Sequence, residues 1–422
     1  MTIQLNIREK ASFAFETGKG LLKKHELAYQ FLMLSHNLLF GAQRKVPAYL
    51  IEGTVRGTNL TTKALYVGGE DSSHQFASRV CSQPFKIVRK EQFPFRCAAS
   101  FSRASSAEII AIRIERPFAS RYSERGFLLL PNVRFVLDLR RSMHEIIRRM
   151  DEGRRRDLKK IEKSRYTYTV HRQDREVFRF FYGKMYLPYV TKRFDKVANI
   201  KTFLESRIAY SLNGGIVMVR KEGQPHAGIL FQVQGKKLLV NSLGVYEGNQ
   251  ELVRAMGAAL FHLIGWAKAK GVELLDYGVC TPFLKDGLFI YKKEWGMSVK
   301  DATDQSFCAL RFNSLTDGSL AFLRQNPFVI YDRGFIKGLV LLEKSPNKDE
   351  LRHLFARYYL PELASLIVVS YYHDSTTSLH DKIDSQTSSD SIRGLGTLLQ
   401  NVCERLQERG YRTRLIELRS MP

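Results

Sequence analysis

Hydrophobic and polar positions follow different patterns in successive parts of the chain. Residues 1–45 space their leucine and phenylalanine residues as amphipathic helices do. From Pro47 to about Arg140 the apolar residues form short runs between loops containing Ser, Gly and Pro, which predicts strands of a mixed α/β unit. Residues 215–246 hold three such runs joined by two turns, the pattern of a β-meander.

One long helix is predicted from Ser142 to about Lys163. Its apolar positions recur at helical spacing, at Met143, Ile147, Met150, Leu158 and Ile161. Ser142 is a suitable N-cap, and Glu145 completes a capping box. Arg154 interrupts the apolar stripe, so it either pairs with a carboxylate at the edge of the core or points at a substrate phosphate or carboxylate.

The segment from residue 238 to residue 297 carries most of the information about function. A strand at Leu238–Tyr246 precedes an amphipathic helix at Glu251–Gly271, and a second strand follows at Val272–Val279. The junction before the helix contains Arg254-x-x-Gly257-x-Ala259. A glycine in such a turn lets backbone N–H groups surround a phosphate at a helix N-terminus.

This junction predicts a pyrophosphate-binding turn. Its amides come from Val253, Arg254, Ala255, Met256 and Gly257, with Ala259 completing the motif. The Arg254 side chain is expected to add charge-assisted contacts. The turn has only one glycine, and the same residues also suit the packed start of a helix without a ligand.

Length and pattern divide the chain into three units. At 422 residues the chain is too long for one ordinary core. We expect a first unit at 1–141, completed by a strand–turn–strand at about 315–345, and a second unit at 142–314. Residues 346–422 show a strand–loop–helix–strand pattern of their own, with a polar loop at 373–391.

The charge balance indicates a polyanionic partner. The chain has 66 Lys and Arg against 42 Asp and Glu, a net charge of +24. Between Arg140 and Arg193 we count 17 basic against 7 acidic residues. A nucleic acid, an anionic membrane surface or a phosphorylated substrate would each suit this excess.

Composition otherwise indicates a folded cytoplasmic protein without metal. An apolar fraction of 44% with 26% charged residues is ordinary, and the longest apolar runs suit buried strands. The N-terminus lacks the apolar core of a signal peptide. Five scattered cysteines without C-x-x-C spacing suggest neither a disulfide framework nor a zinc site. We expect a cytoplasmic location, either free or peripheral to the inner face of the membrane.

The order strand, phosphate-binding turn, helix, strand resembles the second half of an acyltransferase domain of the GNAT superfamily. The sequence Tyr291-Lys-Lys-Glu-Trp-Gly resembles the Phe-Lys-x-x-Phe-Gly ending of the Fem-type aminoacyltransferases, which form peptidoglycan bridges. The resemblance covers roughly Ile109 to Leu342. It implies an α/β (α+β) fold of tandem GNAT-like domains with mixed, largely antiparallel sheets. The first domain is degenerate, because it has no phosphate-turn signature.

The resemblance also implies a cleft and roles for the residues around it. The strands near residues 240 and 275 are expected to diverge and admit an acyl donor. Tyr291 stands where many acetyltransferases have the tyrosine that protonates the leaving thiolate of coenzyme A. Lys292 matches the lysine that contacts the acceptor's phosphate. Alternatively, Tyr291 and Trp295 are core aromatics one helical turn apart and Lys292 is solvated.

A general base and an oxyanion donor are less directly indicated. Asp276 is our candidate base, because the diverging strand would carry it to the cleft floor, although a buried aspartate also commonly caps a loop. A backbone N–H near Val245, on the edge of the preceding strand, is the candidate oxyanion donor.

The helix predicted at Glu176–Phe194 is rich in aromatic and basic residues, a composition that resembles nucleic-acid stacking surfaces. We expect its aromatics to pack as core, with Tyr186, Tyr189 and Arg193 at the acceptor cleft. Pro188 is expected to kink or end the helix.

Together these features predict an N-acyltransferase that moves an acyl group from acyl-CoA to an amine of an anionic acceptor linked to a sugar, peptide or lipid. No covalent enzyme intermediate is needed. One alternative donor is aminoacyl-tRNA, which the net charge suits, although the chain lacks the long helical hairpin inserted in several Fem-type enzymes. The other alternative is a non-catalytic GNAT-like protein that binds anions.

Overall fold

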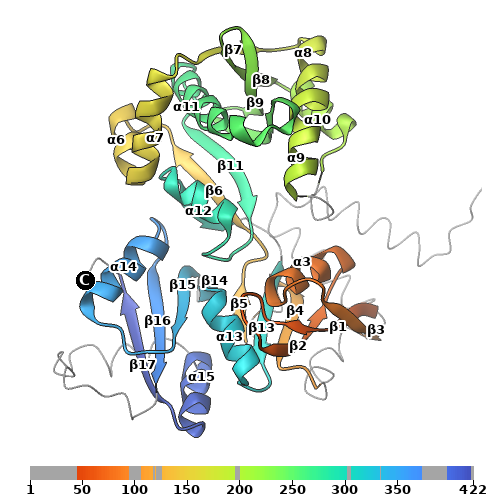
Figure 1. The fold of residues 1–422 in the computed structure, drawn as a ribbon, viewed down its shortest axis with the longest axis vertical. Coiled ribbons are helices and arrows are strands. Elements are labelled where there is room, and N and C mark those ends of the chain that lie inside the picture. The colour runs from red at the N-terminus through yellow and green to blue at the C-terminus, as the bar shows by residue number, and fades with distance from the viewer. Residues whose placement is uncertain are drawn as a thin grey trace, which may run out of the picture.

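The computed structural model describes residues 45–94, 106–116, 119, 126–194, 200–301, 306–332, 334–372 and 397–419. The helices predicted before Lys45 and the polar loop predicted at 373–391 lie outside these residues. Two lobes, each built on one β-sheet, make up the described chain (Figure 1). Both sheets are mixed and largely antiparallel, so the predicted fold class is confirmed.

The first lobe contains a ten-stranded sheet. Its strands in spatial order are β17 (Arg412–Leu418), β16 (Ser365–Tyr372), β15 (Phe335–Leu342), β14 (Phe328–Asp332), β5 (Phe127–Leu129), β13 (Ser306–Phe312), β4 (Ile109–Glu115), β2 (Thr61–Val67), β1 (Lys45–Thr54) and β3 (Lys86–Pro94). Only β2–β4 and β15–β16 pair in parallel. Among the described residues, the helices of this lobe are α3 (Glu70–Val80), α13 (Asp317–Gln325), α14 (Lys348–Tyr358) and α15 (Thr397–Glu408).

The second lobe contains a seven-stranded sheet. Its order is β12 (Ser298–Asp301), β6 (Val133–Asp138), β11 (Leu274–Cys280), β10 (Lys237–Val245), β9 (Gln224–Gln234), β8 (Gly214–Lys221) and β7 (Thr167–His171). The predicted meander is confirmed by the antiparallel pairs β8–β9 and β9–β10. Helix α11 (Val253–Ala269) connects β10 to β11 and buries an alanine- and leucine-rich face on this sheet.

Strand membership links distant parts of the sequence. β16 and β17, near the C-terminus, extend the ten-stranded sheet, and β13 lies between β4 and β5 in it. β6 belongs to the seven-stranded sheet, where it pairs with β11 and β12. The predicted unit boundaries after residues 141, 314 and 345 stay predictions.

The helix predicted from Ser142 to Lys163 is divided in two, so the prediction of one helix is wrong. α6 (Met143–Arg149) begins at the predicted capping box, and α7 (Glu152–Lys163) follows it. Met150 between them is extended, and the Asp151 side chain accepts a hydrogen bond from the Gly153 N–H. An aspartate that caps a new helix start competes with continuation of the preceding helix.

The helix predicted around Pro188 continues through this residue. The proline therefore does not end the helix. α8 (Arg175–Phe180) leads into a π-helical segment, η3 (Phe181–Tyr186), and then into α9 (Leu187–Phe194). The wider π turn ends at Tyr186, two residues before Pro188, which has no N–H to continue the regular bonding pattern. α10 (Phe203–Ser211) follows.

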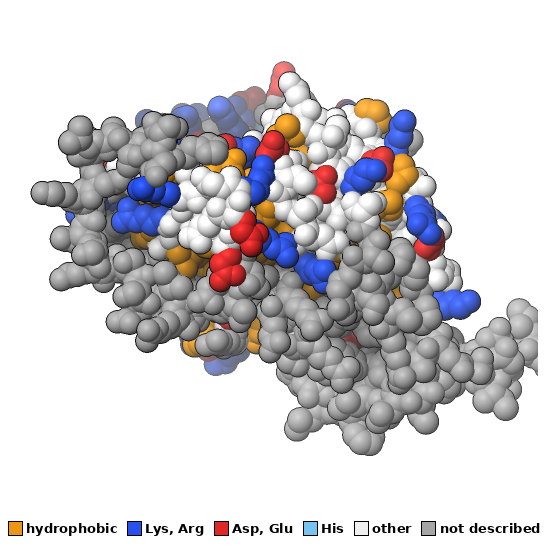
Figure 2. All heavy atoms as spheres, turned by 90° about the horizontal axis from the view of Figure 1, so that it is seen from below, with side chains coloured by type: hydrophobic (Ala, Val, Ile, Leu, Met, Phe, Trp, Pro, Cys, Tyr) orange, Lys and Arg blue, Asp and Glu red, His pale blue; other side chains and the backbone are white. Residues whose placement is uncertain are grey.

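Charged side chains are mixed on the described part of the first lobe's outer face. Figure 2 shows Lys and Arg side chains interspersed there with Asp and Glu. The described part of this face therefore has no large patch of positive charge that would account for the net charge of the chain. The basic region predicted at Arg140–Arg193 lies in the second lobe.

Candidate functional site

Strands β10 and β11 separate in the middle of the second sheet. They pair in parallel only at Lys237–Leu274, Leu238–Leu275 and Leu239–Asp276. Beyond these positions β10 continues to Val245 along β9, and β11 continues to Cys280 along β6. The facing backbone edges at 240–245 and 277–280 do not pair with each other. The predicted divergence of the two strands is confirmed.

Lys292 lies at a bulge in the separated part of β11. The pairing of β11 with β6 shifts between Asp276 and Val279, and Gly278 has a φ of 75°. The Lys292 Nζ donates to the carbonyl oxygens of Gly278, at 3.1 Å, and of Val279, at 3.0 Å. Its side chain comes from α12 (Gly287–Glu294) and is 2% exposed. The alternative of a solvated Lys292 is therefore wrong.

The surroundings of Lys292 lower its affinity for a proton. Burial lowers its pKa to about 8, against the opposing effects of Cys280 and Asp276. Its ammonium lies 5.4 Å from the ring centre of Phe135 and 5.6 Å from that of Tyr277, distances typical of cation–π contacts. The two carbonyl contacts leave one of its three N–H groups for another partner.

Asp276 is held between two cations. Its Oδ2 lies 2.7 Å from the Arg134 Nη1 and 2.7 Å from the Lys237 Nζ, and its Oδ1 accepts from the Gly278 N–H at 2.9 Å. Burial acts to raise the pKa of Asp276, but the hydrogen bonds from Lys237 and Gly278, with the charge of Arg134, hold it below its usual value. This arrangement suits a structural ion pair that anchors the start of the divergence better than a general base.

Four buried polar atoms without a hydrogen-bond partner gather beside the divergence. They are Arg154 Nε, Tyr277 OH, Tyr291 OH and Trp295 Nε1, which we call the donor cluster. Among the described residues eight side-chain atoms are in this condition, so half of them meet at one place. Because such atoms are rare in folded proteins, each requires a reason.

Ring contacts hold the donor cluster together. The Arg154 guanidinium lies 5.0 Å from the ring centre of Tyr291 and 5.5 Å from that of Trp295. The ring centres of Tyr277 and Tyr291 are 6.3 Å apart, as are those of Tyr291 and Trp295. Tyr277 and Tyr291, and Tyr291 and Trp295, are close enough to shift the pKa values of the two phenols, although none of these pairs forms a hydrogen bond of full geometry.

All four groups of the donor cluster carry a proton that they can donate in a hydrogen bond. Burial raises the pKa of Tyr277 well above its usual value and also raises that of Tyr291, against the opposing charge of Arg154. Both hydroxyls therefore stay protonated at neutral pH. The Trp295 N–H and the Arg154 Nε–H can only donate. The cluster is thus suited to an oxygen atom that carries negative charge.

Arg154 meets the first of its two predicted roles, and contact with a substrate stays a prediction. Its Nη2 donates to Glu294 at 2.5 Å and its Nη1 to Asp157 at 3.4 Å, so it pairs with carboxylates. Its Nε, however, is buried without a partner and belongs to the donor cluster. The carboxylates orient the guanidinium and leave this inner N–H available.

The predicted acceptor residues of η3 and α9 occupy different surroundings. The Tyr186 OH accepts from the Lys201 N–H at 2.9 Å, and Tyr186 packs in a local core, which indicates a structural role. Tyr189 is buried, accepts a hydrogen bond from Arg193, and lies close enough to Tyr277 and Tyr291 to influence their pKa values. Arg193 is exposed at the end of α9.

Gly257 does not form the turn before α11, so that part of the prediction is wrong. The turn is formed by the short helices η5 (Tyr246–Gly248) and η6 (Gln250–Leu252), and α11 begins at Val253. Gly257 is buried inside α11, where a Cβ would lie 3.4 Å from Ile161 and 3.6 Å from Trp295. A methyl group at this position would therefore make ordinary van der Waals contacts with Ile161 of α7 and with Trp295.

The other predicted donor-binding residues fall into two groups. Side chains of three are buried in the face of α11, namely Ala255, Met256 and Ala259. Val245 ends β10 opposite Ala227, also with a buried side chain. Arg254 is exposed, and the N–H groups of the first turn of α11 have no i−4 partner within the helix. Of Val245, Arg254, Ala255, Met256 and Ala259, only Arg254 therefore has a side chain that an anion can reach.

Tyr277 was not predicted from the sequence. The sequence gives little indication of a functional role for Tyr277, because it is one aromatic residue in an apolar strand, next to a glycine. Only the bulge at Gly278 and the packing of α12 bring it to Tyr291 and Trp295.

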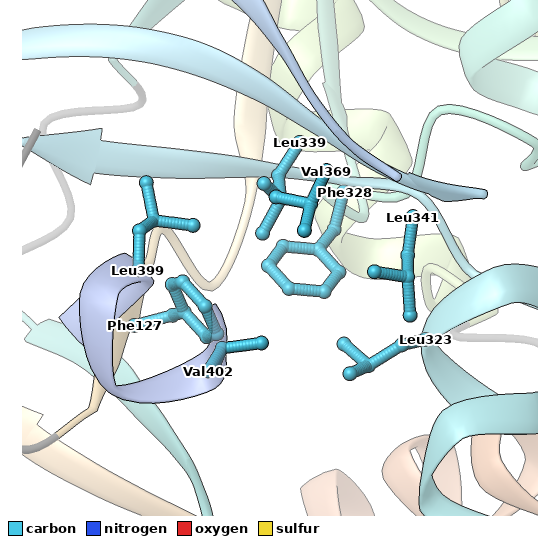
Figure 3. Close-up of a pocket in the computed structure, with 8 residues that line it drawn as sticks. All are labelled: Phe127, Leu323, Phe328, Leu339, Leu341, Val369, Leu399 and Val402. Carbon is cyan, nitrogen blue, oxygen red and sulfur yellow. The ribbon is translucent and has the colours of Figure 1, made fainter. Parts of the chain in front are cut away.

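Other features of the described chain are less suited to chemistry. A cavity of about 10 Å³ in the first lobe is lined only by apolar side chains from its strands, α13 and α15 (Figure 3). It has room for about one water molecule and offers no polar group to hold one. Among the described residues there is no group of three or more His, Cys, Asp or Glu residues suited to a metal, and no helix long and apolar enough to span a membrane.

No protein-family model and no curated protein sequence matches the chain. Solved structures similar to it include FemX, at 12% identity and a TM-score of 0.35, covering 61% of this chain and 83% of that one. L-PGS from Bacillus licheniformis has 13% identity and a TM-score of 0.33, covering 65% and 87%. A GCN5-related N-acetyltransferase from Sphaerobacter thermophilus has 12% identity and a TM-score of 0.28, covering 60% and 73%. These scores are too low for the similarities by themselves to indicate a function.

Proposed function

We propose that the chain is an N-acyltransferase that moves an acyl group from acyl-CoA to an amine of an anionic acceptor linked to a sugar, peptide or lipid. The observation that carries this proposal is the separation of β10 from β11 beyond Leu239 and Asp276. Strands that part inside a sheet leave backbone N–H and C=O groups in need of partners. Since Lys292 already donates to the carbonyls of Gly278 and Val279, an extended donor with amide groups would pair with the remaining groups on these edges, as an added strand does.

The donor cluster supports acyl transfer rather than binding alone. In the reaction the amine nitrogen attacks the carbonyl carbon, the carbon–sulfur bond breaks, and its electron pair leaves on sulfur. Negative charge develops first on the carbonyl oxygen. Donors already oriented in a buried site stabilise such charge most strongly. Tyr277 and Trp295 are 5% and 0% exposed, and neither donor makes a hydrogen bond of full geometry within the described chain.

Tyr291 fits a hydrogen-bonding role at the departing sulfur. A free thiol has a pKa of about 8.5, whereas burial holds the pKa of Tyr291 above its usual value. Complete transfer of the phenolic proton to sulfur is therefore uphill. The Tyr291 hydroxyl stabilises the thiolate by donating a hydrogen bond, and the proton that the sulfur finally takes balances the one that the amine loses.

Basic groups support an anionic acceptor. Lys292 keeps one N–H beyond its two carbonyl contacts, and Arg193 donates to Tyr189, which lies close enough to Tyr277 and Tyr291 to affect their pKa values. A buried cation favours the phosphate or carboxylate of an acceptor over a neutral one. The amides of Val253 and Arg254, with the Arg254 side chain, are proposed to bind the donor's pyrophosphate.

Aminoacyl-tRNA is the second candidate donor. The glycine expected at the phosphate turn lies inside α11, which weakens the case for coenzyme A. The net charge of +24 favours a nucleic acid. The transfer chemistry is the same, with an ester oxygen in place of the thioester sulfur.

Native mass spectrometry and calorimetry test these proposals. Freshly purified protein is examined for a retained thioester, and acetyl-CoA, longer acyl-CoAs and aminoacyl-tRNA are titrated in turn. We expect one donor class to bind and to be consumed when amine acceptors are added. If neither class binds at millimolar CoA ester or micromolar tRNA, the acyltransferase proposal is wrong. Binding without turnover by any amine supports the non-catalytic alternative.

A further inference from the structure

Helix α10 presents its apolar face away from the protein. Leu204, Ile208 and Leu212 are 65%, 49% and 59% exposed, and they recur every fourth residue along α10 and its C-cap. At about 100° per residue they point opposite to Ser206 and Tyr210, which are buried against the sheet. Surface helices normally bury such a stripe, so one that faces solvent indicates a partner.

Arginines surround a hollow next to this stripe. The hollow has a volume of about 380 Å³ and is lined mainly by residues of α8 and α10. These two helices lie at one end of the second lobe (Figure 1). Its cations are Arg175, Arg179 and Arg207. Arg179 pairs with Glu176, while Arg175 and Arg207 have no carboxylate partner among the described residues. The hollow is therefore suited to a phosphate group.

We propose that α10 docks on an anionic lipid bilayer, with Leu204, Ile208 and Leu212 entering the headgroup boundary and the hollow receiving a lipid phosphate. An apolar helix face flanked by basic residues binds a membrane in the interface plane in this way. The excess of positive charge adds attraction to anionic lipids. This inference does not depend on the acyltransferase proposal.

The side chains favour a bilayer over a nucleic acid. Base stacking needs exposed aromatic faces. Phe178 and Tyr210 are 3% and 4% exposed and stack on each other, with ring centres 5.3 Å apart. Among the aromatic residues that line the hollow, Phe203 alone has an exposed ring, at 40%, whereas three aliphatic side chains are exposed beside it. Aliphatic groups gain from contact with acyl chains and not from contact with RNA.

Vesicle co-sedimentation of the full chain tests this proposal. The probes are phosphatidylcholine vesicles with and without phosphatidylglycerol. We expect binding to the anionic vesicles that weakens with salt. The variant L204S/I208S/L212S should lose about tenfold or more in partitioning, because three apolar contacts are removed. The variant R175Q/R207Q should lose roughly tenfold on anionic vesicles only.

Phe335→Ser is the matched control, because Phe335 is 60% exposed in the other lobe. It should bind vesicles as the unchanged chain does, and all variants should keep their melting temperature. The proposal is overturned if the triple variant still binds vesicles, or if Phe335→Ser loses as much. It is also overturned if L204S/I208S/L212S has no effect other than to dissociate a dimer. A further contradictory result is an unchanged chain that does not bind vesicles, together with an R175Q/R207Q variant that loses binding to tRNA.

Discussion

At the scale of single residues, the candidate site is defined by polar atoms that the fold leaves without partners. A buried phenol without a hydrogen bond lowers stability, so its presence in a folded chain indicates use. Tyr277, Tyr291 and Trp295 meet this condition in one place. Tyr210 is the opposite case, since its hydroxyl accepts from the Asp174 N–H at 2.9 Å.

Tyr277→Phe should separate stability from activity. We expect its free energy of unfolding to stay the same or rise by up to about 1 kcal/mol, because an unsatisfied hydroxyl is removed. Transfer rate should fall roughly 10- to 100-fold, because a donor to the developing charge is lost. Tyr210→Phe is the control and should lose about 1 kcal/mol of stability with its rate unchanged. Urea unfolding measures the free energy of unfolding, and initial rates measure the transfer. A Tyr277→Phe variant that is destabilised but fully active would contradict a role of Tyr277 in the reaction.

Lys292 should make stability depend on pH in a defined window. Its pKa is about 8 in the folded chain and has its ordinary value of 10.5 in the unfolded one. Between these values the unfolded chain binds one more proton, so the contribution of Lys292 to stability rises with pH. Below pH 8 both states are protonated and the buried charge is a constant cost.

Lys292→Met should remove this rise. Unfolding in urea at pH 7.5, 8.5 and 9.5 gives the slope of stability against pH for both proteins. Lys270→Met is the control, because Lys270 is exposed on the surface at the end of α11. Equal slopes for Lys292→Met and the unchanged chain would show that Lys292 is not buried as described.

At the scale of elements, two glycines set how closely helices approach the second sheet. A Cβ on Gly244 of β10 would lie 2.6 Å from backbone atoms of Met185 and Tyr186, so η3 rests directly on this strand. The same approach places Tyr189, just beyond η3, beside the donor cluster. Gly257 has more room, since its nearest neighbours are side-chain ends at 3.4 and 3.6 Å.

The two glycines should respond oppositely to alanine. Gly244→Ala should lose more than about 2 kcal/mol of stability, because the backbone of η3 cannot yield to a new methyl group. Gly257→Ala should be neutral or gain up to about 1 kcal/mol, because alanine favours the interior of a helix. Thermal unfolding measures both. A large loss of donor binding by a stable Gly257→Ala variant would restore Gly257 as a phosphate-binding residue.

At the scale of the whole molecule, the segment between β11 and α12 joins the lobes. The Leu284 N–H donates to the Pro327 carbonyl at 2.8 Å, and the Val329 N–H donates to the Pro282 carbonyl at 2.7 Å. Phe283 pairs with Phe328 as an isolated β-bridge. Because β11 and α12 carry the donor cluster, the first lobe supports the site from outside the second sheet.

Phe283→Ala should uncouple the lobes. The loss of a buried ring should cost about 3 kcal/mol and weaken the junction. Both tryptophans, Trp266 and Trp295, lie in the second lobe, so their fluorescence reports that lobe while circular dichroism reports both. In urea the two signals should coincide for the unchanged chain and separate for the variant. Coincident curves for both would mean that other contacts couple the lobes.

The sequence by itself determined the local features of this protein. Hydrophobic periodicity located the meander, α11 and β11. The Ser142 capping box could be identified from the sequence because its residues lie within one helical turn. The divergence of β10 from β11 followed from the resemblance of strand and helix order to a known fold. These features depend on residues close together in the chain.

Only the tertiary structure decided which polar side chains were left without partners. Arg154, Tyr277 and Trp295 lie on α7, on β11 and after α12, and no spacing rule relates them. The break at Asp151, the burial of Gly257 and the outward face of α10 likewise depend on what packs against each element. Burial and partnership are relations between distant segments, so a pattern along one chain does not contain them.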